Sequence, residues 1–137
     1  MIVADASVLM EVLLRTAVGT EVEKQLFAPG QTINIPYLPD LEVLQVLRRY
    51  LRKRVLSAVR ARQAIDDYAD MPLNRYPHGV LLARIWGLRD NFTAYDAAYI
   101  ALAEALDSPL MTCDRAFAAG GHRAKVQIVN GFRIIGR

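Results

Sequence analysis

The stretch IVADASVLMEVLLR, residues 2–15, decides the fold of this chain. Its first residues are apolar and predict a short buried strand that ends at Asp5. Beyond Asp5 the apolar residues recur at intervals of three and four, which predicts a helix from about Ser7 to Arg15. The apolar face of this helix is expected to consist of Val8, Leu9, Val12 and Leu13. Such a strand followed directly by a helix is typical of the opening of an α/β fold.

The same alternation continues along the rest of the chain. Strands are predicted at residues 2–4, 33–35, 110–112 and 126–129, with a further extended segment at 73–76. Helices are predicted at residues 7–15, 20–27, 39–54, 57–71, 80–88, 94–106 and 115–119. This order favours parallel strands joined by right-handed crossovers, with helices on both faces. The predicted fold class is α/β, with a central, mostly parallel sheet of about four or five short strands flanked by helices.

Several helix starts are marked by residues that cap free backbone N–H groups. Thr20 and Thr93 each stand three positions before an acidic residue, which is the pattern of a capping box. Ser57 is expected to cap the helix that follows it, and Pro39 suits the first turn of the helix at 39–54.

Composition limits the class of protein. A chain of 137 residues with 53% hydrophobic and 23% charged residues is expected to bury a core as a single domain over residues 1–137. The single cysteine, Cys113, excludes an internal disulfide framework and indicates a reducing compartment. No apolar run approaches the ~20 residues needed to cross a bilayer, and the start lacks the basic segment of a signal peptide. We therefore expect a soluble, cytoplasmic protein without a membrane partner.

The positive charge is concentrated in one stretch. The chain has 17 basic and 14 acidic residues, and the segment 48–62 contains seven basic residues and no acidic one. These are Arg48, Arg49, Arg52, Lys53, Arg54, Arg60 and Arg62. Such a segment suits phosphate binding, but a solvated helix face explains it equally well.

Four carboxylates stand where strands end or helices begin. Asp5 and Asp114 directly follow predicted strands, and Glu42 and Asp96 lie in the opening turns of predicted helices. In open α/β folds, ligands bind at the carboxyl ends of the strands. Carboxylates that meet there repel one another unless protons or cations neutralise them, and Mg²⁺ or Mn²⁺ suits such oxygen ligands.

Each acid also has an ordinary structural explanation. Asp5 and Asp114 suit the N-caps of the helices after them, and Asp96 belongs to the capping box of Thr93. The helix dipole alone favours an acid at Glu42. Asp40, two residues earlier, competes with Glu42, and spacing does not decide between them.

The sequence resembles the PIN-domain family and, within it, the VapC-type toxins of prokaryotic toxin–antitoxin pairs. Four segments carry the resemblance, and their order and spacing cover nearly the whole chain. They are IVADASVL at residues 2–9, LEV with LRR within 41–49, TAYDAAYIALA at 93–103, and LMTCD at 110–114. The third segment is the most specific.

The resemblance implies a PIN-like fold with an acidic pocket for Mg²⁺ or Mn²⁺ formed by Asp5, Glu42, Asp96 and Asp114. Ser7 and Thr93 are expected to contribute hydroxyls nearby. Glu42 is favoured over Asp40 because the family's acid precedes a valine and a basic pair, found here at Val43 and residues 48–49.

The activity implied is metal-dependent endoribonuclease chemistry that hydrolyses RNA phosphodiester bonds to leave a 5′-phosphate and a 3′-hydroxyl. The RNA backbone is expected to contact Arg48, Arg49, Arg52, Lys53 and Arg54. The partners implied are a second copy of the chain and a VapB-type antitoxin, in a heterotetramer or larger assembly that contacts DNA only through the antitoxin.

Three other functions are weighed against this one. A non-toxin PIN nuclease of RNA maturation and a catalytically silent RNA-binding module both remain open. A phosphorelay receiver expects an acidic pair after the first strand and a lysine at a strand end. Here Asp5 is followed by Ala6, which disfavours the receiver.

The other chemically interesting side chains are assigned to structure. His78 and His122 lack a metal-ligand partner at helical or loop spacing, and Cys113 is expected to pack as a small apolar residue. Core or subunit packing is favoured over base stacking for Trp86, Tyr95 and Tyr99.

Overall fold

The computed structural model describes residues 1–130, and residues 131–137 of the expected domain lie outside that description. A five-stranded sheet with the order β3-β2-β1-β4-β5 forms its centre, and every neighbouring pair of strands is parallel. The strands are β1 (Ile2–Ala4), β2 (Ile33–Pro36), β3 (Leu73–Tyr76), β4 (Leu110–Thr112) and β5 (Val126–Ile128). This architecture confirms the predicted α/β class.

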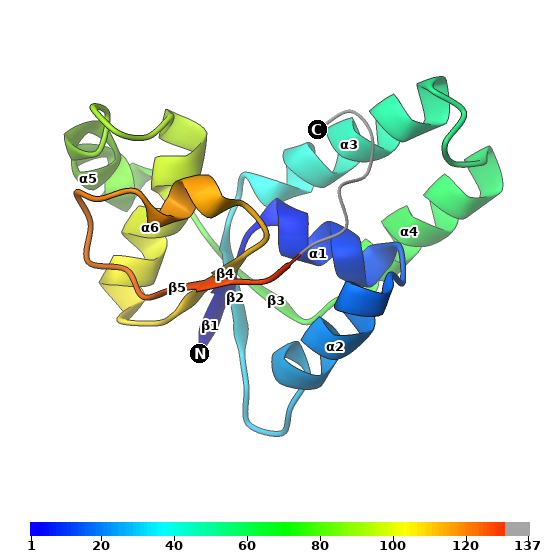
Figure 1. The fold of residues 1–137 in the computed structure, drawn as a ribbon, viewed down its shortest axis with the longest axis horizontal. Coiled ribbons are helices and arrows are strands. Elements are labelled where there is room, and N and C mark those ends of the chain that lie inside the picture. Colours follow the sequence, from blue (N-terminus) through cyan, green and yellow to red (C-terminus); the bar gives the residue numbers. More distant parts are fainter. Residues whose placement is uncertain (131–137) are drawn as a thin grey trace.

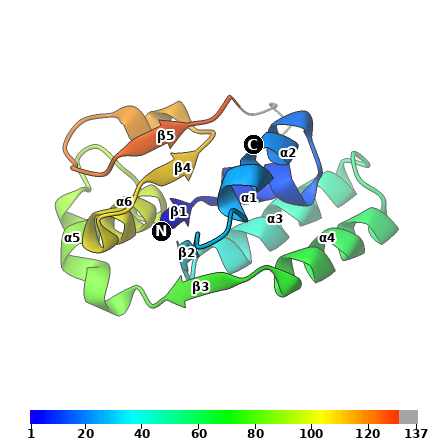
Figure 2. The same ribbon diagram turned by 90° about the horizontal axis from the view of Figure 1, so that it is seen from below.

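Helices cover both faces of the sheet. They are α1 (Ala6–Leu13), α2 (Ala17–Leu26), α3 (Pro39–Arg52), α4 (Ala58–Asp70), α5 (Leu82–Gly87) and α6 (Ala94–Leu106), with short 3-10 helices η1 (Gly79–Leu81) and η2 (Arg115–Ala118). Helices α1 to α4 lie on one side and α5 and α6 on the other, and α3 and α4 run side by side away from the sheet (Figures 1 and 2). None of the helices within residues 1–130 has both the length and the apolar character to cross a membrane.

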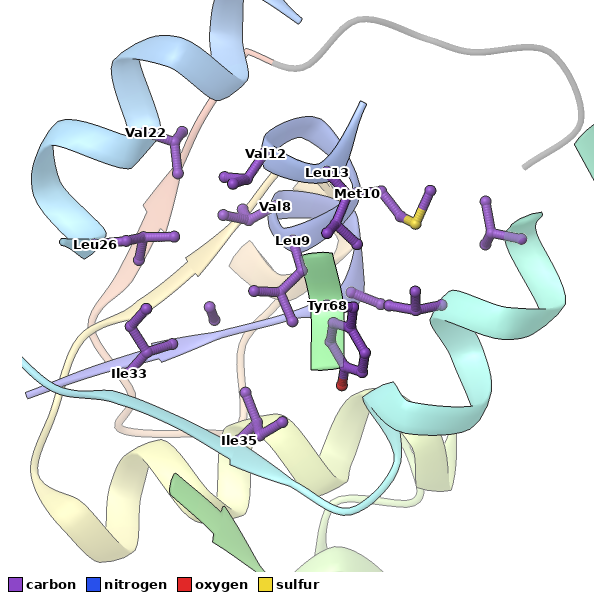
Figure 3. Close-up of a cluster of buried hydrophobic side chains, with 14 of the residues drawn as sticks. Val8, Leu9, Met10, Val12, Leu13, Val22, Leu26, Ile33, Ile35 and Tyr68 are labelled. Atoms are coloured by element: carbon purple, nitrogen blue, oxygen red, sulfur yellow. The ribbon is translucent and has the colours of Figure 1, made fainter. Parts of the chain in front are cut away.

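Two hydrophobic clusters correspond to these two layers. In the first, α1 is surrounded by Val22 and Leu26 of α2, Ile33 and Ile35 of β2, and Tyr68 of α4 (Figure 3). All eight residues of α1 are buried, so this helix has no solvent-facing side. The second cluster packs α6 and η2 against the opposite face of β1 and β4. Because successive strand residues point to opposite faces, Ile2 belongs to the first cluster and Val3 to the second.

The helix starts confirm most of the caps. The hydroxyls of Ser57 and Thr93 accept hydrogen bonds from the third backbone N–H after them, as expected. Helix α1 begins at Ala6 and is capped by Asp5, one residue earlier than predicted. The helix predicted at 80–88 is divided into η1 and α5.

The capping box expected at Thr20 is wrong. Helix α2 begins at Ala17, and its cap is Thr16, whose hydroxyl accepts from the Gly19 N–H over 2.9 Å and also donates to the carboxylate of Glu11. Gly19 lies directly on α1, where an added Cβ would be 2.0 Å from the Glu11 carbonyl oxygen. The cap therefore stands four residues earlier than predicted, and the first turn of α2 packs closely on α1.

Candidate functional site

Asp5 lies at the carboxyl end of the central strand, buried to 1% exposure. In the parallel pair of β1 and β4, Val3 is opposite Leu110 and Ala4 is opposite Met111. The backbone N–H of Asp5 donates to the Met111 carbonyl over 3.2 Å, which continues the pairing beyond β1. This register brings Thr112 beside the Asp5 side chain.

Three donors hold the Asp5 carboxylate. Its Oδ1 accepts from the Ser7 hydroxyl at 2.5 Å and from the Val8 N–H at 3.2 Å, and its Oδ2 accepts from the Thr112 hydroxyl at 2.6 Å. Ser7 Oγ also accepts from the Cys113 N–H at 2.9 Å, so it ties the start of α1 to the end of β4. A buried carboxylate needs such donors to offset its lost hydration. Ser7 therefore lies beside Asp5 as expected, and Thr112 is a partner that the sequence analysis missed.

Glu42 lies in the first turn of α3 and meets Tyr99, which projects from α6. The Tyr99 hydroxyl donates to Glu42 Oε1, and the Ala6 N–H is a hydrogen-bond partner of the same hydroxyl. Burial, together with the charges of Glu42 and Asp5, raises the pKa of Tyr99 well above its usual value, so the hydroxyl keeps its proton at neutral pH. Tyr99 thus has both acids in its electrostatic environment.

Asp40, the competing acid, is engaged elsewhere. Both of its oxygens accept from Arg75 Nε at 3.0 Å, and Oδ1 also accepts from the Tyr68 hydroxyl at 2.6 Å. Burial and the neighbouring Asp40 carboxylate raise the pKa of Tyr68. Asp40 therefore links α3 to α4 and β3, whereas Glu42 faces α6.

Asp96 lies in the first turn of α6, three residues before Tyr99. Residues three apart share one face of a helix, so Asp96 and Tyr99 lie on the same side of α6. The Asp96 N–H donates to the Thr93 hydroxyl over 3.1 Å. Thr93 thus caps the helix that carries Asp96, which is the local role expected from the capping box.

Asp114 follows β4 and is connected to Asp5 through one hydroxyl. Its N–H donates to Thr112 Oγ1 at 2.9 Å, and this same oxygen donates its proton to Asp5. The Asp114 carboxylate accepts from the Ala116 N–H at 2.9 Å and so caps η2. The Asp114 side chain therefore caps η2, whereas its backbone N–H is the group linked to Asp5 through Thr112.

The structure thus brings Glu42 to the hydroxyl of Tyr99, whose electrostatic environment includes Asp5, and it places Asp96 in α6 and Asp114 directly after β4. Within residues 1–130, no three His, Cys, Asp or Glu side chains are already gathered into a metal-binding group. The possible ligand atoms at Asp5 and Glu42 are carboxylate oxygens, and the hydroxyl oxygens of Ser7, Thr112 and Tyr99 lie beside them. This donor chemistry fits a hard divalent cation such as Mg²⁺, although the described side chains do not form a closed coordination shell.

Comparison with known proteins identifies the family. Residues 2–122 match the model of the PIN domain. The chain belongs to the PIN-domain family.

Relatives place this PIN domain in the VapC-type branch. The ribonuclease VapC12 of Mycobacterium tuberculosis is 35% identical over 130 residues, which cover 94% of this chain and 99% of the relative. The ribonuclease VapC9 of the same species is 40% identical over 114 residues, covering 83% of this chain and 86% of the relative. The solved structure of VapBC2 from Rickettsia felis, bound to a DNA fragment from their promoter, gives a TM-score of 0.69 at 13% identity and covers 94% of this chain and 99% of that one.

The basic residues of this PIN domain lie toward the other end of α3. Arg48 and Arg52 are exposed, as are Lys53 and Arg54 just beyond the helix. At ~1.5 Å per residue, Arg52 is about 15 Å along α3 from Glu42. Arg49 is half-buried, and its Nε is enclosed without a hydrogen-bond partner.

The remaining predictions have mixed outcomes in the PIN domain. Tyr99 is a core residue at 2% exposure, whereas Trp86 and Tyr95 are 68% and 64% exposed and belong to the surface of this chain. His122 is satisfied by a contact of 2.8 Å between Nε2 and the Phe117 carbonyl oxygen. Cys113 is half-buried and packs against the first hydrophobic cluster.

Proposed function

We propose that this PIN domain is a metal-dependent endoribonuclease and the toxin of a VapBC-type toxin–antitoxin pair. The observation that carries the proposal is the pairing of Glu42 of α3 with the buried Tyr99 hydroxyl of α6, in an electrostatic environment that includes Asp5 at the carboxyl end of β1. The relatives named ribonuclease VapC support RNA as the substrate.

The proposed cation ligands are Asp5, Glu42 and Asp96, assisted by Asp114, and the proposed cation is Mg²⁺ or Mn²⁺. A divalent cation supplies Lewis acidity and compensates the negative charge that develops at the scissile phosphate. Ser7 and Thr112 keep Asp5 in place, so that its carboxylate needs little rearrangement to act as a ligand. Without a cation, the same negative side chains repel the phosphate of RNA.

The proposed protein partners are a second copy of the chain and a VapB-type antitoxin, joined as a heterotetramer or larger assembly. DNA contact would come through the antitoxin. The fold shared with the VapBC2 complex supports a partner of this kind. Exposed apolar side chains at Val80 and Trp86 suit a protein contact better than solvent.

The proposed RNA contacts are Arg48, Arg49, Arg52, Lys53 and Arg54. With the acids at one end of α3 and these side chains toward the other, an RNA strand along the helix would meet both. Backbone contacts of this kind position the substrate without selecting its sequence.

The test is cleavage of RNA by the purified full chain. Cleavage should stop with a chelator, return with Mg²⁺ or Mn²⁺, and be lost in folded Asp5→Asn and Asp96→Asn variants. The control is Asp40→Asn, because that carboxylate is occupied by Arg75 and Tyr68. Cleavage at the wild-type rate by Asp5→Asn would reject the proposal, and RNA binding without cleavage would identify a silent binding module.

The toxin role needs a separate experiment in cells. Expression of the wild type, but not of Asp5→Asn, should arrest growth, and coexpression of a small protein encoded next to the gene should relieve the arrest. Sequencing RNA ends after induction of both forms identifies the cleaved RNA. Unimpaired growth together with accurately trimmed RNA ends would favour a nuclease of RNA maturation.

A further inference from the structure

We propose that Tyr99 is a positioning residue that fixes the Glu42 carboxylate at the carboxyl edge of the sheet, where Asp5 also lies, and so prepares the site for its cation. This inference rests on the proposed function, because it assigns to Tyr99 a part in the same acidic site. Tyr99 acts through Glu42 and takes no part itself in the reaction.

The first argument is the place of the hydroxyl in the fold. Glu42 belongs to α3, whose apolar residues pack in the first hydrophobic cluster, and Tyr99 belongs to the second cluster on the opposite face. The hydrogen bond between them therefore joins the two layers at the carboxyl edge of the sheet. The Ala6 N–H, at the start of α1 directly after Asp5, is a further partner of the same hydroxyl.

The second argument is the rigidity of the group that holds Glu42. Tyr99 is 2% exposed, and its ring packs edge-on against Phe117 with centroids 6.3 Å apart and planes at 76°. The hydroxyl is therefore fixed by the core, whereas Glu42 has a long side chain at a half-buried position. Holding this side chain in place before the cation binds reduces the conformational entropy that is lost on binding.

The third argument is chemical. Two carboxylates in one electrostatic environment repel each other, and a neutral donor lets Glu42 remain near Asp5 without adding charge. The Tyr99 hydroxyl is such a donor, because it donates its proton to Glu42 Oε1. A second acid or a lysine at this position would change the charge that the cation meets.

The test is Mn²⁺ binding by the full chain, measured by titration calorimetry or from the free-ion resonance signal. Tyr99→Phe removes the hydroxyl and leaves the ring that packs against Phe117. We expect Mn²⁺ affinity to fall by about 10- to 100-fold, as is usual when a group supporting a metal ligand is lost. The control is Tyr76→Phe, because the Tyr76 hydroxyl donates to Asn34 at 3.1 Å and does not touch the acids.

A double-mutant cycle separates positioning from general destabilisation. If Tyr99 acts through Glu42, then Tyr99→Phe with Glu42→Gln should bind Mn²⁺ no more weakly than Glu42→Gln alone. Urea unfolding without metal reports any loss of stability separately. Additive losses, or unchanged affinity in folded Tyr99→Phe, would overturn the inference.

The inference and the proposed function fail in different ways. If the wild type binds Mn²⁺ and cleaves RNA while Tyr99→Phe does both equally well, only the inference is rejected. If the wild type neither binds Mn²⁺ nor cleaves RNA, the proposed function is rejected and the positioning role with it.

Discussion

Thr112 donates its hydroxyl to Oδ2 of Asp5 over 2.6 Å, across 107 positions of sequence, and both side chains are at most 1% exposed. Thr112→Val would leave that buried oxygen without its hydroxyl donor and the Asp114 N–H without its acceptor. We expect the free energy of unfolding without metal to fall by about 1–3 kcal/mol. Thr112→Ser, which keeps the hydroxyl, should lose less. If the valine variant unfolded at the same urea concentration as the wild type, this hydrogen bond would not stabilise the fold.

Asp40 and Glu42 provide a matched pair of neighbouring acids with different partners. Glu42→Gln should reduce RNA cleavage by about 100-fold or more, because it alters a proposed cation ligand. Asp40→Asn should retain cleavage and lose no more than about 1 kcal/mol of stability, since its bond to Arg75 is partly exposed to solvent. Cleavage rates and thermal melts of both variants test this. If Asp40→Asn were the inactive variant, the assignment of the two acids would be reversed.

The elements that sequence predicts well are those fixed by local interactions. The helix starts at Ser57 and Thr93 depend on hydrogen bonds within three positions, and both are found where expected. The start of α2 was missed because Thr16 caps the helix four residues before Thr20, and its first turn packs closely on α1 at Gly19. A capping pattern alone cannot reveal such a crossing.

The residues of the candidate site also divide into those that the sequence makes visible and those whose role depends on distant partners. The acids are visible in sequence because they stand at strand ends and helix starts. Thr112 and Tyr99 were not recognised, since their partners lie 107 and 57 positions away in the chain. One signal was available for each: Thr112 precedes Asp114 by two residues at a strand end, and Tyr99 follows Asp96 by one helical turn.

Glu104 provides a pH-dependent contribution to stability outside the site. Its carboxylate accepts from Arg84 Nε at 2.7 Å and from a second Arg84 nitrogen at 3.0 Å, and these bonds lower the pKa of Glu104. A lowered pKa in the folded state stabilises the protein above the ordinary pKa and loses this effect as the pH falls through the folded value. Glu104→Gln should therefore be less stable by about 1–3 kcal/mol at pH 7. The difference should shrink below pH 4.5, the ordinary value for glutamate. Melts from pH 3 to pH 7 test this, and a constant difference would contradict it.

Gly19 should not tolerate a methyl group. Alanine normally stabilises a helix relative to glycine by about 1 kcal/mol, but here the new Cβ would lie 2.0 Å from the Glu11 carbonyl oxygen. We expect Gly19→Ala to destabilise the fold by about 1–3 kcal/mol through overpacking of α1 against α2. Gly79→Ala is the control, because no atom lies within 4 Å of its added Cβ. Equal urea midpoints for the two variants would show that the helices can separate without cost.

The exposed basic residues at the end of α3 should contribute to RNA affinity through charge. In the inactive Asp5→Asn background, we expect replacing Arg52, Lys53 and Arg54 with glutamine to weaken RNA binding. If all three contact phosphates, the slope of log affinity against log salt should fall by about 2, at roughly 0.7 for each phosphate contact to a single strand. Fluorescence anisotropy over a salt series measures both quantities.

The control for that experiment removes three cations that already have acidic partners. Arg15, Lys24 and Arg62 pair with Asp67, Glu21 and Asp66 at 3.6, 3.1 and 3.2 Å. Replacing them with glutamine changes the net charge of the chain by the same amount, so a purely global field would give equal losses of affinity. A larger loss from the end of α3 would indicate local phosphate contacts, because only nearby cations release counterions from the strand. Equal losses would mean that this end of α3 is an ordinary solvated surface, and the RNA path proposed along the helix would be wrong.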